Sequence, residues 1–389
     1  MDKELLGHKF ILFCQDHYNP LGIVRSLGEK GIRPIAIMVV NDGYTPKLIP
    51  KSKYIGIIHY VNSIEEGYTL LKEEYGKEQK KPFLYSSSDD IGSYLDLHYN
   101  ELINQFFFFH GKEQGIVTKY MNKSAINQLA ENSGFSVLKN QVVKKGELPQ
   151  GLRYPVITKA IISTLYAWKG DMHICNNEDE LKEAYKTIRS EEILIQEFIK
   201  KKNELCLDGF SYNNGEEVII PYYTNYLRFT DDSYGGSMIL KPFSDDRILD
   251  NLRKLFKEIG FTGIFEVEFL IDQEDNYHFL EVNFRNSTWS YAYTYGGYDM
   301  PYLWAKATVE GRLNLSSIQP KELIHAISEE DDFSQYVKTR KIGICKWIYE
   351  LFKADCLFLF NKKDCYPGLK MLIRMLGGQI LRNLGLKKV

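Results

Sequence analysis

The residues best suited to chemistry lie between Gly263 and Asn286, in the sequence GIFEVEFLIDQEDNYHFLEVNFRN. This segment predicts two β-strands joined by a polar turn at residues 272–276. Successive side chains of a strand point to opposite faces, so Glu266 and Glu268 share one face of the first strand. The same alternation predicts an apolar face on the other side of that strand.

The return strand has a polar face that carries Glu281, Asn283 and Arg285. Its apolar face is predicted to consist of three residues: Leu280, Val282 and Phe284. If the two strands pair, carboxylates, an amide oxygen and a guanidinium gather on one surface. Such oxygen ligands suit Mg²⁺ (or Mn²⁺), and a guanidinium suits a phosphate oxygen or a carboxylate. The hairpin is therefore a candidate site for a metal and a triphosphate, although a solvated sheet face also carries charged residues.

The composition limits the function classes. A chain of 389 residues is long enough for two or three domains with a large core. Its 49 Lys and Arg residues nearly balance its 51 Asp and Glu residues, so the net charge of -2 gives no basic field of the kind that nucleic acid requires. Six scattered cysteines without CxxC pairs favour reduced thiols over a zinc site or disulfides. With no signal sequence and no apolar run of about 18 residues, we expect a cytoplasmic protein that does not bind nucleic acid.

Residues 8–109 alternate apolar runs of strand length with helical stretches. The runs KFILFC, PIAIMVV, YIGII, PFLY and FFFF predict an open parallel α/β sheet. The first strand-to-helix turn, CQDHYNPLG, lacks the GxGxxG pattern, so a dinucleotide site is not expected. The loop SSSDD at residues 86–90 begins a helix, where capping explains its composition and a ligand site is the alternative. A domain boundary is expected near residue 110.

Two lysines stand out beyond this boundary. Lys123 opens a helix with the sequence KSAINQLAENSG, and Lys159 lies near the end of the apolar strand YPVITKA. A lysine on a half-buried strand needs a partner, which a phosphate would provide, although a lysine at a strand end is more often exposed. The next segment, ISTLYAWKGDM at residues 162–172, is a candidate flap over a phosphate.

Two further segments offer polar groups to a ligand. A strand is expected to end at Gln196, the first residue of the sequence QEFI, and Glu204 follows five residues after this sequence. The Glu204 carboxylate would accept hydrogen bonds from an adenine amino group or a ribose. The alternative is that Glu204 lies on a solvated turn. Arg228 begins the loop LRFTDDSYGG and is a second candidate for an anion contact. After the hairpin every second residue is aromatic: Trp289, Tyr291, Tyr293 and Tyr295. These rings predict either a flat surface for a substrate or core packing.

Taken in order along the chain, these features resemble the motifs of the ATP-grasp enzymes. The matching positions are Lys123, Lys159, QEFI at 196–199, Glu204, Glu268 and EVNFR at 281–285. The fold that this resemblance implies is α/β (α+β), with a Rossmann-like pre-ATP-grasp domain at residues 1–110 and a two-subdomain ATP-grasp domain at residues 111–325. The lid subdomain would span residues 136–196, and a basic helical C-terminal region would span residues 326–389.

Within this superfamily the chain is most similar to D-aspartate ligase and related bacterial carboxylate-amine ligases. The resemblance implies an ATP-dependent ligase that joins a small-molecule carboxylate to an amine through an acylphosphate. An amino acid and a cell-envelope precursor or sugar are the expected substrates, and a homodimer is expected. The chain departs from the family pattern in its flap, which lacks a glycine-rich run, and in the alanine that follows Lys159.

The resemblance also assigns roles to individual residues. The expected ligands of Mg²⁺ (or Mn²⁺) are Glu268, Glu281 and Asn283. The expected ATP contacts are Lys123, Lys159, Gln196, Glu197, Phe198, Ile199 and Glu204. The expected catalytic residues are Arg285 and Arg228, which would neutralise charge during phosphoryl transfer. Such a mechanism needs no protein nucleophile, which agrees with the lack of a recognisable Ser-His or Cys-His arrangement.

Residues 337–389 are basic, with twelve Lys and Arg residues against three acidic residues. Two helical stretches, at residues 343–360 and 369–386, mix apolar side chains with these cations, as a membrane-surface helix does. Peripheral membrane contact is therefore one expectation. The alternative is a pair of helices that pack on the body of the enzyme.

Three other functions fit part of the pattern. A different ATP-grasp reaction, such as carboxylation or carbamoyl phosphate formation, would need biotin-related or glutaminase partners on another chain. A glycosidase would use Glu268 and Glu281 as its acid and nucleophile, against which the two lysines and Arg285 argue. A nucleotide-binding protein without turnover would bind ATP and release no ADP.

Overall fold

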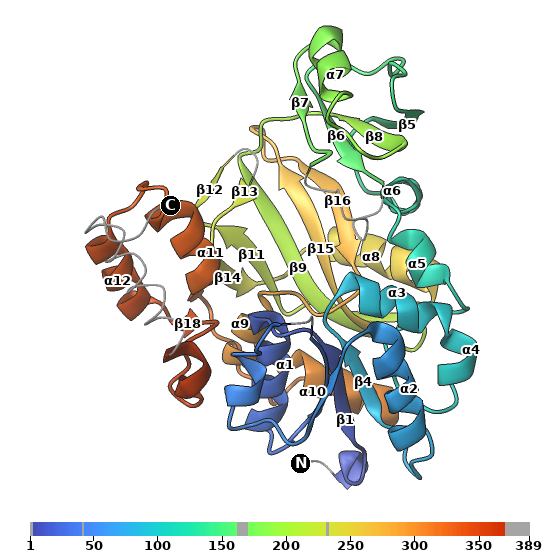
Figure 1. Cartoon of the computed structure of the whole chain (residues 1–389), viewed down its shortest axis with the longest axis vertical. Helices are drawn as coiled ribbons and strands as arrows, with labels where there is room; N and C mark the ends of the chain where they lie inside the picture. The colour runs from blue at the N-terminus through green and yellow to red at the C-terminus, as the bar shows by residue number, and fades with distance from the viewer. Residues whose placement is uncertain (1–2, 41–42, 162–169, 231–232, 370–389) are drawn as a thin grey trace.

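The computed structural model describes residues 3–40, 43–161, 170–230 and 233–369. Figure 1 shows an N-terminal α/β layer, a large central sheet beside it and a smaller sheet at the top of the view. The predicted α/β class is confirmed, because a parallel sheet with its helices precedes mainly antiparallel sheets.

The N-terminal segment forms a parallel sheet in the order β3-β2-β1-β4. Its strands are β1 (Phe10–Cys14), β2 (Ile35–Val39), β3 (Ile58–Val61) and β4 (Phe83–Ser86). Its helices are α1 (Tyr18–Glu29), α2 (Ile64–Tyr75), α3 (Asp89–Leu97) and α4 (Tyr99–Leu102). Neighbouring residues of β1 face opposite sides, so Leu12 packs in the core shared with α1 and Phe13 packs in the core shared with α2. The predicted open parallel sheet is confirmed, but its strand β3 begins at Ile58, the last residue of the third apolar run YIGII, so that strand lies after the run and not on it.

The fifth apolar run, Phe106–Phe109, does not form the predicted strand. Its only pairing among the described residues is an isolated bridge between Phe107 and Phe83. Phe106 and Phe108 are nevertheless about 1% exposed. The run is apolar because it fills the core, and burial alone does not require a strand.

The central sheet runs β16-β15-β9-β11-β14-β17-β18, with β10 paired to β9. Its strands are β9 (Asn203–Tyr212), β10 (Glu217–Ile219), β11 (Tyr222–Tyr226), β14 (Ser237–Pro242), β15 (Gly263–Ile271), β16 (Tyr277–Asn283), β17 (Ile324–Ile327) and β18 (Cys356–Leu357). A short hairpin of β12 (Phe229–Thr230) and β13 (Ser233–Tyr234) lies between β11 and β14 in the chain. The amphipathic helix α8 (Asp246–Ile259) is capped by Asp245 and packs its apolar side into the core of this sheet.

The smaller sheet, here called the lid sheet, has the order β5-β8-β6-β7. Its strands are β5 (Asn140–Lys144), β6 (Val156–Ala160), β7 (Ile174–Cys175) and β8 (Glu192–Glu197), and it carries α7 (Glu178–Ala184). The helices α5 (Ile116–Tyr120) and α6 (Lys123–Asn132) precede it in the chain. Most of the predicted phosphate flap, residues 162–169, lies outside the described residues.

The segment after the hairpin forms the helix α9 (Ser290–Tyr295), followed by α10 (Met300–Glu310). Trp289, Tyr291 and Tyr293 are at most 4% exposed, and Trp289 Nε1 donates to the Tyr226 hydroxyl at 3.0 Å. Core packing, the alternative to a substrate surface, is therefore confirmed for these three rings, whereas Tyr295 is 36% exposed. In a helix, residues two apart do not share a face, so the alternating rings are distributed around α9.

The C-terminal region contains α11 (Glu329–Asp332), a short π-helix (Phe333–Val337) and α12 (Ile344–Lys353). It was expected to be helical, but β18 (Cys356–Leu357) pairs with β17 and extends the central sheet. The first predicted helical stretch therefore ends at Lys353, and residues 370–389 of the second lie outside the described residues. In the part of the chain that the structure covers, no helix combines the length and apolar composition that crossing a bilayer requires.

A buried ion pair fastens the C-terminal region to α1. Arg25 Nε lies 3.0 Å from Asp364 Oδ2, and both side chains are at most 1% exposed. Arg25 also donates to the carbonyl oxygens of Phe358 at 2.7 Å and Leu359 at 2.8 Å. The described part of the C-terminal region thus packs on the body of the protein. This agrees with the alternative given for it, in which its helices pack on the body.

Candidate functional site

The predicted hairpin is confirmed, and it places the carboxylates on adjacent strands. β15 pairs with β16 so that Glu268 lies opposite Glu281 and Glu266 lies opposite Asn283. The amide nitrogen of Asn283 donates to both glutamates of β15, at 3.1 Å each. On its other edge β15 pairs with β9, which puts Asp208 opposite Glu266. Oxygen ligands from three strands therefore share one face of the central sheet.

One residue of the return strand departs from the predicted alternation. The pairing steps from Glu268–Glu281 to Phe269–Phe279, so Leu280 is the extra residue of a β-bulge. Phe279 takes the core position, at 1% exposed, and Leu280 is only partly buried. The prediction that Leu280 lies in the core was wrong because it assumed an unbroken period of two.

The carboxyl groups on this face are buried close together, and the pKa of three of them is raised. Burial and the adjacent Asp208 raise the pKa of Glu266 to about 8. Burial and Glu281 raise the pKa of Glu268 well above its usual value. Burial also raises the pKa of Asp208, to about 7. A divalent cation would favour the ionised forms of these carboxyl groups, and their oxygens are ligands of the type that it prefers.

The described residues contain no group of three His, Cys, Asp or Glu side chains gathered tightly enough to hold a metal ion alone. Mg²⁺ in nucleotide sites is usually bound through one or two carboxylates and the phosphates of a substrate. The predicted ligands Glu268, Glu281 and Asn283 lie together on the hairpin and offer oxygens of the required type. Their role as metal ligands stays a prediction.

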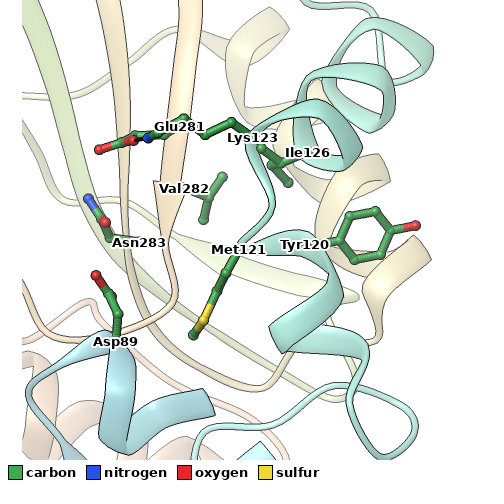
Figure 2. Close-up of a pocket in the computed structure, with 8 residues that line it drawn as sticks. All are labelled: Asp89, Tyr120, Met121, Lys123, Ile126, Glu281, Val282 and Asn283. Carbon is green, nitrogen blue, oxygen red and sulfur yellow. Dashed lines mark hydrogen bonds and ion pairs between the residues drawn. The ribbon is translucent and has the colours of Figure 1, made fainter. Parts of the chain in front are cut away.

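Two lysines face this group from different elements. Lys123 is the first residue of α6, and its ammonium forms an ion pair with Glu281 (Figure 2). The backbone nitrogen of Lys123 bonds to the carbonyl of Ile161 at 3.0 Å, so the start of α6 lies beside the end of β6. Lys159 projects from β6 and donates to Gln196 Oε1 at 2.8 Å. The structure therefore brings together both predicted lysines and the hairpin.

The two lysines differ in their pKa. Burial and the neighbouring Lys123 ammonium lower the pKa of Lys159 to about 8. Burial also lowers the pKa of Lys123, but the Glu281 carboxylate outweighs it and leaves the pKa above its usual value. Burial raises the pKa of Glu281, and Lys123 in turn brings it below its usual value. At neutral pH both lysines are charged, and Lys159 is the one that loses its proton on mild alkalinisation.

The predicted ATP contact of Lys159 implies that ATP binding should weaken as the pH rises through about 8. A phosphate is attracted to the ammonium of Lys159 and not to the neutral amine, so the Kd for ATP should increase by up to about tenfold per pH unit above that value. Equilibrium dialysis between pH 6.5 and 9.5 measures it. The Lys159→Arg variant keeps its charge over this range and should lose the dependence. An unchanged pH dependence in Lys159→Arg would contradict the assignment.

The predicted hinge QEFI lies at the end of β8, and its first two side chains have different surroundings. Gln196 is 2% exposed and accepts the hydrogen bond from Lys159. Glu197 points the other way along the strand, where it accepts from the backbone nitrogen of Arg153 at 3.0 Å. The backbone nitrogen of Phe198 donates to Pro155 at 2.8 Å, and Ile199 is partly buried.

Glu204, at the start of β9, forms an ion pair with Lys201 at 2.6 Å, and both side chains are less than 10% exposed. Lys201 Nζ also lies 5.7 Å from the ring centre of Phe229. The solvated turn that was the alternative for Glu204 is thus wrong. Its contact with a nucleotide stays a prediction, as do those of the QEFI residues.

Arg285 reaches across to the N-terminal sheet. Its Nε lies 2.8 Å from Asp89 Oδ1 at the start of α3, and its NH2 lies 3.3 Å from Asn283 Oδ1. Burial lowers the pKa of Arg285, but Asp89 and Glu266 outweigh it and raise the pKa above its usual value. The guanidinium is charged at every pH of interest and borders the hairpin carboxylates.

The sequence interpretation favoured helix capping for the SSSDD loop, kept a ligand site as the alternative, and did not single out Asp89. Ser88 occupies the cap position without a side-chain hydrogen bond to the helix, and Asp89 turns toward the central sheet. The available signal was the position of SSSDD at the carboxyl end of a parallel strand, where α/β proteins place ligands. A small pocket is lined by the residues of Figure 2: Asp89, Tyr120, Met121, Lys123, Ile126, Glu281, Val282 and Asn283.

Arg228 is held by the C-terminal region. Its Nε and NH2 contact the carboxylate of Asp332 at 2.9 and 2.5 Å, and its NH1 contacts Glu350 of α12 at 2.5 Å. Burial lowers the pKa of Arg228, but these two carboxylates raise it above its usual value. The guanidinium therefore fastens α12 to the end of β11, and its predicted catalytic role stays untested by this geometry.

Comparison with known proteins gives one family and several relatives. The family described as carbamoyl-phosphate synthase L chain, ATP binding domain, matches residues 118–315, just over half of the 389-residue chain. N5-carboxyaminoimidazole ribonucleotide synthase of Staphylococcus aureus strain COL is 28% identical over 137 residues, 34% of this chain and 34% of the relative. The chain thus spans about a third of the length of the curated relatives it matches.

Two solved structures share the fold over most of the chain. The L-amino acid ligase from Bacillus licheniformis has a TM-score of 0.61 at 13% identity, covering 82% of this chain and 79% of its own. N5-carboxyaminoimidazole synthetase from Staphylococcus aureus has a TM-score of 0.63 at 15% identity, covering 87% of this chain and 88% of its own. At such identities the likeness shows a common fold.

Proposed function

Since the chain belongs to the ATP-grasp superfamily, we propose that it is an ATP-dependent carboxylate-amine ligase that releases ADP. The observation that carries this proposal is the pairing of Glu268 with Glu281, with Asn283 beside them and Lys123 and Lys159 facing them. Oxygen ligands for a cation and ammonium groups for phosphates stand together, as phosphoryl transfer requires.

The proposed cofactors are ATP and Mg²⁺ (or Mn²⁺), which Glu268, Glu281 and Asn283 would hold through their oxygens. A bound cation would neutralise charge on the transferred phosphoryl group. Lys123 and Lys159 would hold the phosphates in place by their charge. The nucleotide would lie along the hinge at residues 196–199 and against Glu204, between the lid sheet and the central sheet.

Arg285 is the proposed catalytic arginine. It stands where the hairpin meets the N-terminal sheet, so it can contact both a phosphate and the carboxylate that attacks it. Arg228 would need to leave Asp332 or Glu350 to take the catalytic role proposed for it. The acylphosphate formed in this step would then be captured by an amine to give an amide.

The proposed substrates are an amino acid and a cell-envelope precursor or sugar. The similarity to a solved L-amino acid ligase supports an amino acid as one of them. A second candidate is a carboxylase-like reaction with bicarbonate as the carboxylate, which the similarity to N5-carboxyaminoimidazole ribonucleotide synthases favours. We also propose that the protein works in the cytoplasm as a homodimer, for which light scattering would give the mass of two chains.

ADP release with ATP and Mg²⁺ should be stimulated by one amino acid together with one amine or acidic sugar. The measurement is a coupled ADP assay across a panel of amino acids, amino sugars and uronic acids, with bicarbonate as a separate arm. Mass spectrometry of the product should show the sum of both substrates less one water. Stimulation by bicarbonate alone would move the function to the carboxylase candidate. ATP binding without ADP release in any arm would indicate a nucleotide-binding protein without turnover.

A further inference from the structure

The outward face of α12 exposes large aromatic side chains. Phe352 is 86% exposed and Tyr349 is 57% exposed, whereas Trp347 on the opposite side is fully buried. Residues three apart in a helix lie on one face, so the two exposed rings are neighbours. α12 lies at the left margin of the molecule, beside α11 and far from the lid sheet (Figure 1).

Cations surround these rings. Lys346 and Lys353 are exposed on the same side of α12, and Lys353 Nζ lies 4.6 Å from the ring centre of Tyr349. The segment at residues 338–341, which precedes α12, adds three exposed cations: Lys338, Arg340 and Lys341. Glu350, the one acidic residue of the helix, is turned inward to Arg228. The outward face thus presents positive charge and aromatic rings without a competing carboxylate from its own helix.

The inner face fixes the orientation of α12. Trp347 Nε1 donates to Asp332 at 2.9 Å, and its ring packs against Phe333 with centroids 5.2 Å apart. Together with the pair between Arg228 and Glu350, these contacts hold the helix on the body. The aromatic and basic face is therefore preformed and does not depend on a partner to order it.

We propose that the outward face of α12 binds the surface of an anionic phospholipid bilayer. Tyr349 and Phe352 would insert at the level of the headgroups, and Lys346 and Lys353 would contact anionic headgroups, as in interfacial helices. A bilayer suits this face because it accepts aromatic rings and cations together. The sequence of residues 370–389 continues the same charge, with five Lys and Arg residues and no acidic residue.

This surface is separate from the carboxylates and lysines of the proposed active site. The proposal of bilayer binding does not rest on the ligase reaction. In the described structure the hairpin and the lid sheet are not contacted by the four α12 residues that it uses: Lys346, Tyr349, Phe352 and Lys353. Failure of one proposal therefore leaves the other standing.

Cosedimentation of the full chain with vesicles tests the proposal. The probes are vesicles of phosphatidylcholine alone and vesicles of phosphatidylcholine with phosphatidylglycerol. The full chain should bind the anionic vesicles, release at high salt and bind the neutral ones at least tenfold more weakly. Each of two double variants, Tyr349→Ser with Phe352→Ser and Lys346→Gln with Lys353→Gln, should weaken binding by about tenfold or more.

Two control variants test whether the loss of any exposed lysines, or of any exposed ring, weakens vesicle binding. Lys182→Gln with Lys186→Gln removes two exposed lysines on or next to α7, and Tyr60→Ser removes an exposed ring on β3. These variants should bind anionic vesicles like the unaltered chain. Thermal unfolding and ADP release without lipid should be the same for the α12 variants and the controls, which shows that the α12 variants are folded.

Three outcomes would overturn the proposal. The first is undiminished vesicle binding by both α12 variants, which would assign binding elsewhere, including residues 370–389. The second is equal binding to neutral and anionic vesicles. The third is loss of a lipid-free dimer in the Tyr349→Ser, Phe352→Ser variant with no vesicle binding by the unaltered chain, which would make a second copy of the chain the occupant.

Discussion

Replacing Glu281 with glutamine should lower kcat for ADP release by about a thousand-fold. The substitution keeps the shape of the side chain but removes a charge that faces both Glu268 and Lys123. A carboxylate at this position is the proposed metal ligand and also orients the Lys123 ammonium. No other carboxylate lies opposite Glu268 on β16, so no neighbour replaces the lost charge. A coupled ADP assay at saturating ATP and Mg²⁺ gives the rate.

Glu274→Gln is the matched control for this experiment. Glu274 lies exposed in the turn of the same hairpin, so it tests whether loss of one negative charge on this element matters in itself. Its activity should equal that of the unaltered chain. The assignment of Glu281 would be wrong if Glu281→Gln kept its rate within about tenfold, the smallest loss expected for a group that supports the reaction only indirectly.

Replacing Arg25 with alanine should lower the free energy of unfolding by about 3–5 kcal/mol. The change leaves Asp364 buried without its cation, and it removes the donors that satisfy the carbonyl oxygens of Phe358 and Leu359. Burying an unpaired charge is among the most costly single changes in a protein. Urea unfolding followed by tryptophan fluorescence measures the loss.

Arg253→Ala supplies the comparison for Arg25→Ala. Arg253 forms an ion pair with Asp250 one turn away on α8, but both side chains are well exposed. Exposed pairs of this kind contribute little to stability, so the unfolding curve should barely move. Equal shifts in the two variants would show that the buried pair is not what holds the C-terminal region.

The sequence predicted the parts of the site that depend on local periodicity. The alternation of Glu266 and Glu268 with apolar residues identified β15, and the turn at residues 272–276 paired it with β16. A run of short apolar segments separated by helices identified the N-terminal parallel sheet. On the hairpin the signal is the alternation of polar and apolar residues, whereas β1 and β4 are buried on both faces and appear in the sequence as continuous apolar runs.

The predictions that failed concern residues whose position depends on contacts between segments far apart in the sequence. Leu280 left its predicted face because a bulge adds one residue to β16, and no sequence pattern marks that bulge. Tyr291 and Tyr293 show the every-second-residue pattern of a strand but lie in the helix α9. The pattern misleads because residues on every side of α9 are buried. Asp89 reached the site only because α3 stands opposite Arg285, nearly two hundred residues later in the chain.

The ion pair between Arg25 and Asp364 also sets an order of events during synthesis. The two residues are 339 positions apart, and a ribosome adds roughly 5–20 residues per second. Arg25 therefore waits on the order of 20 s to a minute before its partner exists. During that time the Arg25 guanidinium lies on a face of α1 that is buried in the folded protein. This face stays hydrated until Asp364 has been synthesised. Closure of the C-terminal region over α1 therefore cannot precede the synthesis of Asp364.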